Sequence, residues 1–220
     1  MHASEPSKFL ILDQAKFMKL FFSPTSPYVR KVMICAHELG LSEKLELLPA
    51  KASPVNRDPS IVEKNPLGKV PTLLTSEGRA LYDSRVICEY INELGSGNLF
   101  PKSGALRWEA ITLQALGDGL LDAALLARYE TFLRPKELCW TDWVNGQLEK
   151  IHSALTDFEM QIDHHKDTFH IGHITLACSL GYLDLRFEHL EWRKSYPKLK
   201  TWFEEISKRE SIKKEWALPT

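Results

Sequence analysis

A segment rich in glycine, serine and proline at residues 95–104 divides this chain into two parts with different hydrophobic patterns. Before the segment, short apolar runs typical of strands alternate with helical patterns, whereas after it apolar residues recur only at helical spacing. This change predicts an α/β domain followed by an all-α domain. We expect an N-terminal extension at 1–17, the first domain at 18–95, a linker at 96–104 and the helical domain at 105–220.

The first part has the pattern of a small mixed sheet with helices. Two apolar runs favour strands at 19–23 and 45–49, and turn residues between two further runs favour a hairpin at 70–82. Pro27 opens one amphipathic helix, and a second follows at 84–94. Together these elements predict a compact α/β unit of about 80 residues, an ordinary size for a domain.

The second part has four helical patterns, at 105–133, 141–165, 175–190 and 196–208. Proline and glycine residues separate them. We therefore expect a helical domain without strands.

The charged residues nearly cancel, since 28 Lys and Arg stand against 29 Asp and Glu. This balance gives no reason to expect nucleic acid or an anionic membrane as a partner. The apolar runs are far shorter than the roughly 20 residues that cross a bilayer, and the N-terminal residues lack the pattern of a secretory signal. Four cysteines without close spacing suit reduced thiols. We expect a soluble, cytoplasmic protein.

The segment FFSPTSPYVRKV at 21–32 puts Ser26 between a predicted strand and a predicted helix. Serine followed by proline is a favoured helix start, with serine as the N-cap and Pro27 in the first turn. The same position also suits a second role, because a hydroxyl at a helix N-terminus can donate a hydrogen bond to an anion above it. The residues alone leave both interpretations open.

Several features, taken in order, resemble the glutathione S-transferase superfamily. They are the small α/β unit, the stretch NPLGKVPTL at 65–73, the Asp83-Ser84 pair at a helix start, and the helical second domain. The TSPYVRK segment at 25–31 is most similar to bacterial serine-type cytosolic members. The resemblance covers about residues 18–210 and implies an N-terminal thioredoxin-like domain followed by a C-terminal helical bundle.

The resemblance implies that the 65–73 stretch binds glutathione. In the family the peptide bond that corresponds to Val70-Pro71 is cis, and the main-chain N–H and C=O matching Val70 pair with the cysteinyl part of glutathione. Lys69 resembles the residue that reaches the glycyl carboxylate. The structural alternatives are a trans proline that starts an edge strand and a lysine that is simply solvated.

Asp83 and Ser84 resemble the residues that hold the γ-glutamyl end. By this resemblance Ser84 binds the carboxylate and Asp83 approaches the amino group. The family more often has glutamate where Asp83 stands, which is one methylene longer. Ser84 is also a natural N-cap, so capping alone is the alternative.

Ser26 is the candidate that activates the glutathione thiol. Free thiols titrate near 8.5, so ionisation near neutrality asks for about 2–3 kcal/mol, within reach of one charge-assisted hydrogen bond and a helix N-terminus. Thr25 and Ser23 are alternative hydroxyls. Glutathione would then be a co-substrate, and we expect no metal.

The second substrate would lie against the helical domain. We expect its pocket to include side chains from both domains: Tyr28, Trp108, Asp122, Tyr129 and Tyr182. Asp118 and Asp122, four residues apart, either line a groove between the domains or make ordinary polar contacts. The identity of the electrophile does not follow from these residues.

Two patterns in the second domain bear on folding. Four histidines between residues 164 and 173 lie in a predicted loop, without the acidic partners that would complete a metal site. Family members open a buried helix with Ser or Thr followed three residues later by Asp, a capping box. Here we expect Thr175 as the cap, with Cys178 in the place of the carboxylate.

These features favour a cytosolic glutathione transferase that attacks a small electrophile, as in detoxification, and the resemblance implies a homodimer. One alternative is a non-catalytic binding or regulatory protein with the same fold. Another is a weak glutathione-dependent reductase or peroxidase. The serine at position 26 disfavours it, because a hydroxyl cannot form a mixed disulfide.

Overall fold

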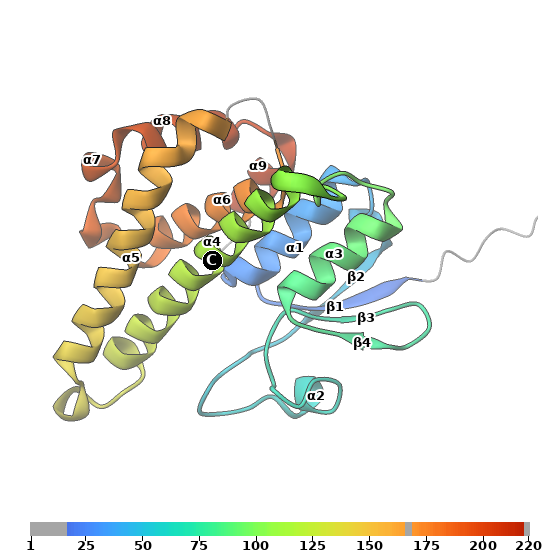
Figure 1. Cartoon of the computed structure of the whole chain (residues 1–220). Coiled ribbons are helices and arrows are strands. Elements are labelled where there is room, and N and C mark those ends of the chain that lie inside the picture. The colour runs from blue at the N-terminus through green and yellow to red at the C-terminus, as the bar shows by residue number, and fades with distance from the viewer. Residues whose placement is uncertain (1–16, 166–168, 218–220) are drawn as a thin grey trace, which may run out of the picture.

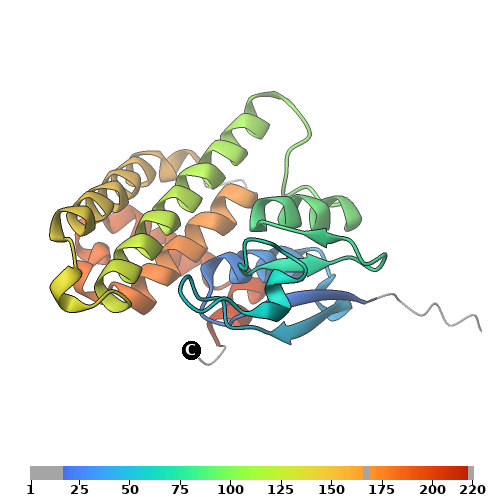
Figure 2. The same cartoon turned by 90° about the horizontal axis from the view of Figure 1, so that it is seen from below.

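The computed structural model describes residues 17–165 and 169–217, which form two domains (Figures 1 and 2). The N-terminal domain contains a four-stranded sheet with helices, and the described residues of the C-terminal domain form helices joined by loops, without strands. This is the predicted fold class, a thioredoxin-like domain followed by a helical domain. The expected N-terminal extension lies outside the described residues except for Phe17.

The sheet has the strand order β2-β1-β3-β4. β1 pairs with β2 in parallel, which requires a crossover between them, and α1 supplies it. β3 runs antiparallel to both β1 and β4. The strands are β1 Met18–Phe22, β2 Leu45–Pro49, β3 Thr72–Leu74 and β4 Ala80–Leu81.

Two helices, α1 (Pro27–Glu38) and α3 (Ser84–Leu94), lie side by side on one face of the sheet (Figure 1). Leu20 of β1 and Ile87 of α3 are fully buried in the core between these layers. The short helix α2 (Pro59–Val62) lies on the other side of the sheet, as both views show.

The C-terminal domain is built around α6, which packs against α4 in its own domain and against α1 in the N-terminal domain. The long helix α4 meets the length and composition of a membrane span, but it packs against α5 and α6 as a core helix. The helices are α4 Gly104–Phe132, α5 Thr141–Gln161, α6 Ile171–Arg186, α7 Trp192–Ser195, α8 Pro197–Ile206 and α9 Glu210–Trp216. Short 3₁₀ segments are η1 Ser42–Lys44, η2 Lys136–Leu138, η3 Ile162–His165 and η4 Glu188–Leu190.

Helix α6 begins at Ile171, so the predicted start with Thr175 as its cap was wrong. The N-cap is His170, whose Nδ1 accepts a hydrogen bond from the N–H of Gly172 at 3.2 Å. The Nδ1 of His173 accepts the N–H of His170 at 3.3 Å. Two imidazoles thus take the positions that serine and aspartate hold in an ordinary capping box. The predicted loop at these histidines is therefore a helix start, and Thr175 bonds inside the helix to the carbonyl of Ile171 at 2.8 Å.

Candidate active site

Ser26 is the N-cap of α1, at the end of a tight turn that follows β1. The main-chain N–H of Ser26 donates to the carbonyl of Ser23 at 3.1 Å, and Pro27 occupies the first helical position. The Oγ of Ser26 accepts a hydrogen bond from the N–H of Val29 at 3.3 Å. A hydroxyl that accepts in this way keeps its own O–H as a donor. The predicted cap is confirmed, and the geometry leaves the hydroxyl able to donate to a group above the helix.

The Lys69–Pro71 stretch lies beside the end of β1, because Thr72 of β3 pairs with Phe21 of β1. The Val70-Pro71 peptide bond is cis, as the resemblance implied. Buried Asn65 stabilises the stretch, donating from Nδ2 to the hydroxyl of Thr72 at 2.9 Å, and that hydroxyl donates to the carbonyl of Lys69 at 2.8 Å. The Lys69 side chain remains exposed.

Helix α3 begins at Ser84 as predicted, but its cap lies one residue before the predicted one. Its N-cap is Asp83 rather than Ser84, because an Oδ1 of Asp83 accepts the N–H of Arg85 at 2.9 Å. Aspartate caps helices as well as serine does, so two adjacent capping residues leave the boundary ambiguous in the sequence. Ser84 is the first helical residue and is buried, whereas Asp83 is exposed.

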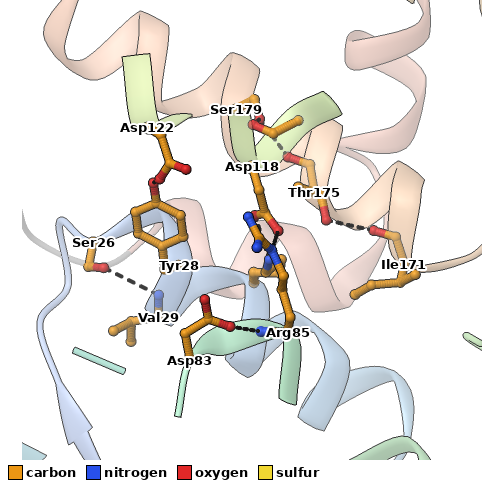
Figure 3. A network of polar contacts seen from close by, with 12 residues as sticks. Ser26, Tyr28, Val29, Asp83, Arg85, Asp118, Asp122, Ile171, Thr175 and Ser179 are labelled. Carbon is orange, nitrogen blue, oxygen red and sulfur yellow. Dashed lines mark hydrogen bonds and ion pairs between the residues drawn. The ribbon is translucent and has the colours of Figure 1, made fainter. Parts of the chain in front are cut away.

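A buried aspartate of α4 joins the two domains. Asp118 accepts the Nζ of Lys31 at 2.6 Å with one oxygen and the Nε of Arg85 at 2.8 Å with the other (Figure 3 shows Asp118 and Arg85). Lys31 and Asp118 are 0% and 1% exposed, whereas the Arg85 side chain is 50% exposed. Loss of the carboxylate would leave the Lys31 charge buried and unpaired, a defect that costs about 3–5 kcal/mol. Asp118 therefore fixes α1 and the start of α3 against α4.

Sequence reasoning missed Lys31 and Arg85, and for Asp118 it left open a groove between the domains or an ordinary polar contact. A local signal does exist. Lys31 lies near the apolar residues Val29, Val32 and Met33 of its helix, and Asp118 lies in the apolar stretch of a long helix. Charges in such positions are rarely buried unless they are paired.

Tyr28 reaches across the domain boundary to Asp122, one turn beyond Asp118 on α4. Its hydroxyl donates to an Oδ1 of Asp122, as Figure 3 shows, with Ser26 at the start of the same helix. The pKa of Tyr28 is strongly raised, mainly by burial and to a smaller extent by the hydrogen bond to Asp122. The phenol is therefore neutral and acts as a donor. Two aspartates on one face of α4 thus meet the starts of α1 and α3.

The other three predicted pocket residues have different locations. Trp108 is 66% exposed and precedes Asp122 by 14 residues on α4, a separation of about 21 Å along the helix. The structure therefore does not bring Trp108 to Ser26. Tyr129 lies about 10 Å beyond Asp122 on the same helix and is half-buried. Tyr182 of α6 is 5% exposed, and burial raises the pKa of both tyrosines.

A cavity of about 640 Å³ lies in the C-terminal domain, away from these residues. Its walls come mainly from η3 and α8. Charged groups on its rim are already paired, Lys198 with Asp163 at 2.7 Å and Arg209 with Glu38 at 2.6 Å. Among the described residues, no group of three or more His, Cys, Asp or Glu is arranged to hold a metal. The polar chemistry therefore concentrates where α1, α3 and α4 meet.

The chain matches two family models described as "Glutathione S-transferase, N-terminal domain" at residues 25–94 and "Glutathione S-transferase, C-terminal domain" at residues 141–205. It is 34% identical over 199 residues to the "Uncharacterized GST-like protein YibF" of Escherichia coli strain K12, covering 89% of this chain and 96% of that protein.

Two solved structures of a glutathione transferase family member from Pseudomonas fluorescens Pf-5 are also similar. One has bound glutathione, with a TM-score of 0.88 and 45% identity. The other has bound S-(propanoic acid)-glutathione, with a TM-score of 0.84 and 44% identity. Each similarity covers 90% of this chain and 98% of the other.

Proposed function

Since this chain belongs to the glutathione S-transferase family, we propose that it is a serine-type transferase that binds glutathione and activates its thiol for attack on a small electrophile. The observation that carries the proposal is Ser26 at the N-cap of α1, with its oxygen accepting from Val29 and its proton available to donate.

Ser26 stabilises the thiolate in two ways. Its hydroxyl donates a charge-assisted hydrogen bond to sulfur, and the N-terminus of α1 adds a favourable field. Together they supply the roughly 2–3 kcal/mol that brings a thiol from its usual pKa toward neutrality. The thiol proton passes to solvent. A sulfur electron pair then forms the S–C bond, and the displaced electrons leave with the leaving group or remain on a conjugated acceptor that takes up a proton.

Glutathione would be bound by the residues that match the family pattern. The main chain of Val70, beside Pro71, pairs with the cysteinyl part, and Ser84 holds the γ-glutamyl carboxylate at the start of α3. Asp83 approaches the amino group with a short side chain that already caps α3. Exposed Lys69 reaches the glycyl carboxylate. Bound glutathione in a relative that is 45% identical supports this assignment.

The second substrate would lie between Ser26 and α4. Tyr28 and Asp122 form the near side, and Tyr129 and Tyr182 supply ring surface farther along the helical domain. The relative solved with S-(propanoic acid)-glutathione supports a small carbon electrophile whose product is a thioether. Trp108 has no part in this pocket, because of its distance along α4.

We also propose a soluble, cytoplasmic homodimer. Apolar side chains on α3 and at the junction of α4 and α5 support a protein interface, because Val86, Phe132 and Trp140 are all exposed. Sedimentation of the purified protein at micromolar concentration tests this, with a dimer expected and a monomer as the contrary result.

Calorimetric titration with glutathione tests the main proposal, and we expect saturable binding. No binding at millimolar glutathione would favour a non-catalytic protein of the same fold. Turnover is then measured with a panel of carbon electrophiles. We expect Ser26→Ala to bind glutathione but lose activity, while Thr25→Ala serves as the control for the neighbouring hydroxyl. Unchanged turnover in Ser26→Ala would exclude its proposed role.

The reductase alternative is weaker. The cysteines that could exchange disulfides, Cys35, Cys88 and Cys178, are buried, and Cys139 is only half-exposed. Ser26 offers no sulfur for a mixed disulfide. Assays with mixed disulfides and peroxides should therefore give far lower rates than those with electrophiles.

A further inference from the structure

Arg30 lies under the turn that carries Ser26. It occupies the first turn of α1 and is 6% exposed. Its Nε donates to the carbonyl oxygen of Pro24 at 2.8 Å, two residues before Ser26. The turn therefore has a side-chain anchor from the helix that it opens, in addition to the hydrogen bond from Ser26 N–H to Ser23.

The other end of Arg30 contacts the C-terminal helix α9. The guanidinium carbon lies 4.9 Å from the centroid of the Trp216 ring, within the range of a cation–π contact. The Trp216 ring in turn packs against Gly181 of α6, where an added Cβ would come within 2.7 Å of it. Arg30 thus links the Ser26 turn to the Trp216 ring of α9, which packs against α6.

A buried guanidinium needs compensation, since desolvation of a charge is unfavourable. Here the compensation comes from the Pro24 carbonyl and the Trp216 ring. One nitrogen, Nη2, has no hydrogen-bond partner among the described residues. An apolar side chain would fill this space with fewer unsatisfied groups, so simple packing does not account for an arginine here. The hydrogen bond to the turn is what an apolar residue could not provide.

We propose that Arg30 is a positioning residue for Ser26: its hydrogen bond to Pro24 holds the turn so that the Ser26 hydroxyl and the N-terminus of α1 face the same point. This inference rests on the proposed role of Ser26 in thiolate stabilisation. A hydrogen bond to sulfur depends steeply on direction, so a turn that moves weakens thiolate stabilisation before it weakens binding of the rest of glutathione.

The test compares Arg30→Met, which keeps an apolar stem but removes the donor, with Arg209→Gln. Arg209 also joins α9 to α1, through Glu38 at 2.6 Å, but it does not touch the Ser26 turn. The control therefore loosens α9 without removing the Pro24 anchor. Arg30→Lys, which keeps the charge over Trp216 but lacks Nε, provides a second variant in case Arg30→Met does not fold.

The first measurement is amide hydrogen exchange of residues 23–29 without any ligand. We expect exchange at least about threefold faster in the Arg30 variants and unchanged in Arg209→Gln. The second is the ultraviolet absorbance of the thiolate of bound glutathione against pH. We expect the bound thiol to titrate about one pH unit higher, which is about a tenfold lower ratio of thiolate to thiol, with glutathione affinity within about threefold.

Unchanged exchange in folded Arg30 variants, or an equal thiol shift in Arg209→Gln, would overturn the inference. If the wild-type protein binds no glutathione, the proposed function fails, and the exchange measurement still decides whether Arg30 orders the turn.

Discussion

The Nδ1 of His173 accepts the main-chain N–H of His170 at 3.3 Å, and the two imidazole rings lie 4.1 Å apart at the start of the central helix α6. Both side chains are 2% exposed. An imidazole nitrogen that accepts must be unprotonated, so both rings cap the helix in their neutral forms. The start of the most buried helix therefore depends on two histidines.

The first prediction concerns this capping pair. His173→Leu puts an apolar side chain of similar size in the same place but removes the Nδ1 acceptor. The buried main-chain N–H of His170 then loses this hydrogen bond. We expect the free energy of unfolding to fall by about 1–3 kcal/mol, measured by urea denaturation. His189→Leu is the control, because His189 is an exposed histidine outside the cap. Equal stability of the two variants would contradict a capping role for His173.

The second prediction concerns the close approach of α4 and α6. A Cβ on Gly117 would lie 2.8 Å from the Cγ2 of Thr175, whereas a Cβ on Gly119 would meet nothing within 4 Å. Both alanine variants gain the same helix propensity, so their difference isolates the clash. Thermal and urea unfolding should show Gly119→Ala more stable by about 0.5–1 kcal/mol and Gly117→Ala less stable by about 1–3 kcal/mol. Similar gains in both would mean that the helices can separate freely.

The third prediction concerns Glu215, which is 2% exposed. Burial raises the pKa of its carboxyl to about 7, and the nearby Arg30 charge opposes this shift more weakly. Its Oε1 lies 3.3 Å from the Nε2 of His37, and burial lowers the pKa of His37. Both shifts favour neutral side chains. The contact is therefore a hydrogen bond between neutral groups rather than an ion pair over part of the pH range below 7.

Because the folded-state pKa of Glu215 lies above its ordinary value near 4.5, the native state binds more protons between about pH 4.5 and 7. Its contribution to stability is complete below that range and is lost as pH rises through 7. The shift in His37 acts in the opposite direction. Glu215→Gln should therefore reduce the loss of unfolding free energy between pH 5 and pH 8 by about 1–3 kcal/mol. Glu210→Gln, on the exposed side of α9, should follow the wild type, and the same slope in all three proteins would refute the prediction.

Local patterns in the sequence were enough for most of the elements. The apolar run at 45–49 matches β2, and the amphipathic pattern at 84–94 matches α3, because in each case side-chain spacing and flanking turn residues agree. Ser26 was identified as an N-cap for the same reason. The start of α6 was not found, since histidine is uncommon as a cap and the same residues read as a loop.

Contacts between residues far apart in the chain could not be predicted from the sequence. The contact between Lys31 and Asp118 joins residues 87 positions apart, and that between Tyr28 and Asp122 joins residues 94 apart. Helical spacing shows which face a residue occupies but not which helix lies opposite. Trp108 was expected in the pocket, but it lies 14 residues before Asp122 on α4.

The last prediction concerns the contact between Tyr28 and Asp122, which links the helix that begins after Ser26 to α4. Since burial keeps the Tyr28 phenol neutral, the hydroxyl acts as a donor that holds the ring toward α4, and Tyr28→Phe removes that restraint. We expect glutathione affinity and the pH profile of the bound thiol to stay unchanged, because Ser26 is untouched. The ratio of kcat/KM for a bulky to a small electrophile should rise about 3- to 10-fold, which corresponds to about 0.7–1.4 kcal/mol between transition states. Tyr90→Phe, a half-buried tyrosine on α3, is the control and should leave that ratio unchanged. An unaltered ratio in Tyr28→Phe would mean that the contact joins the domains without shaping the pocket, whereas a shifted thiol titration would mean that Tyr28 shares the role assigned to Ser26.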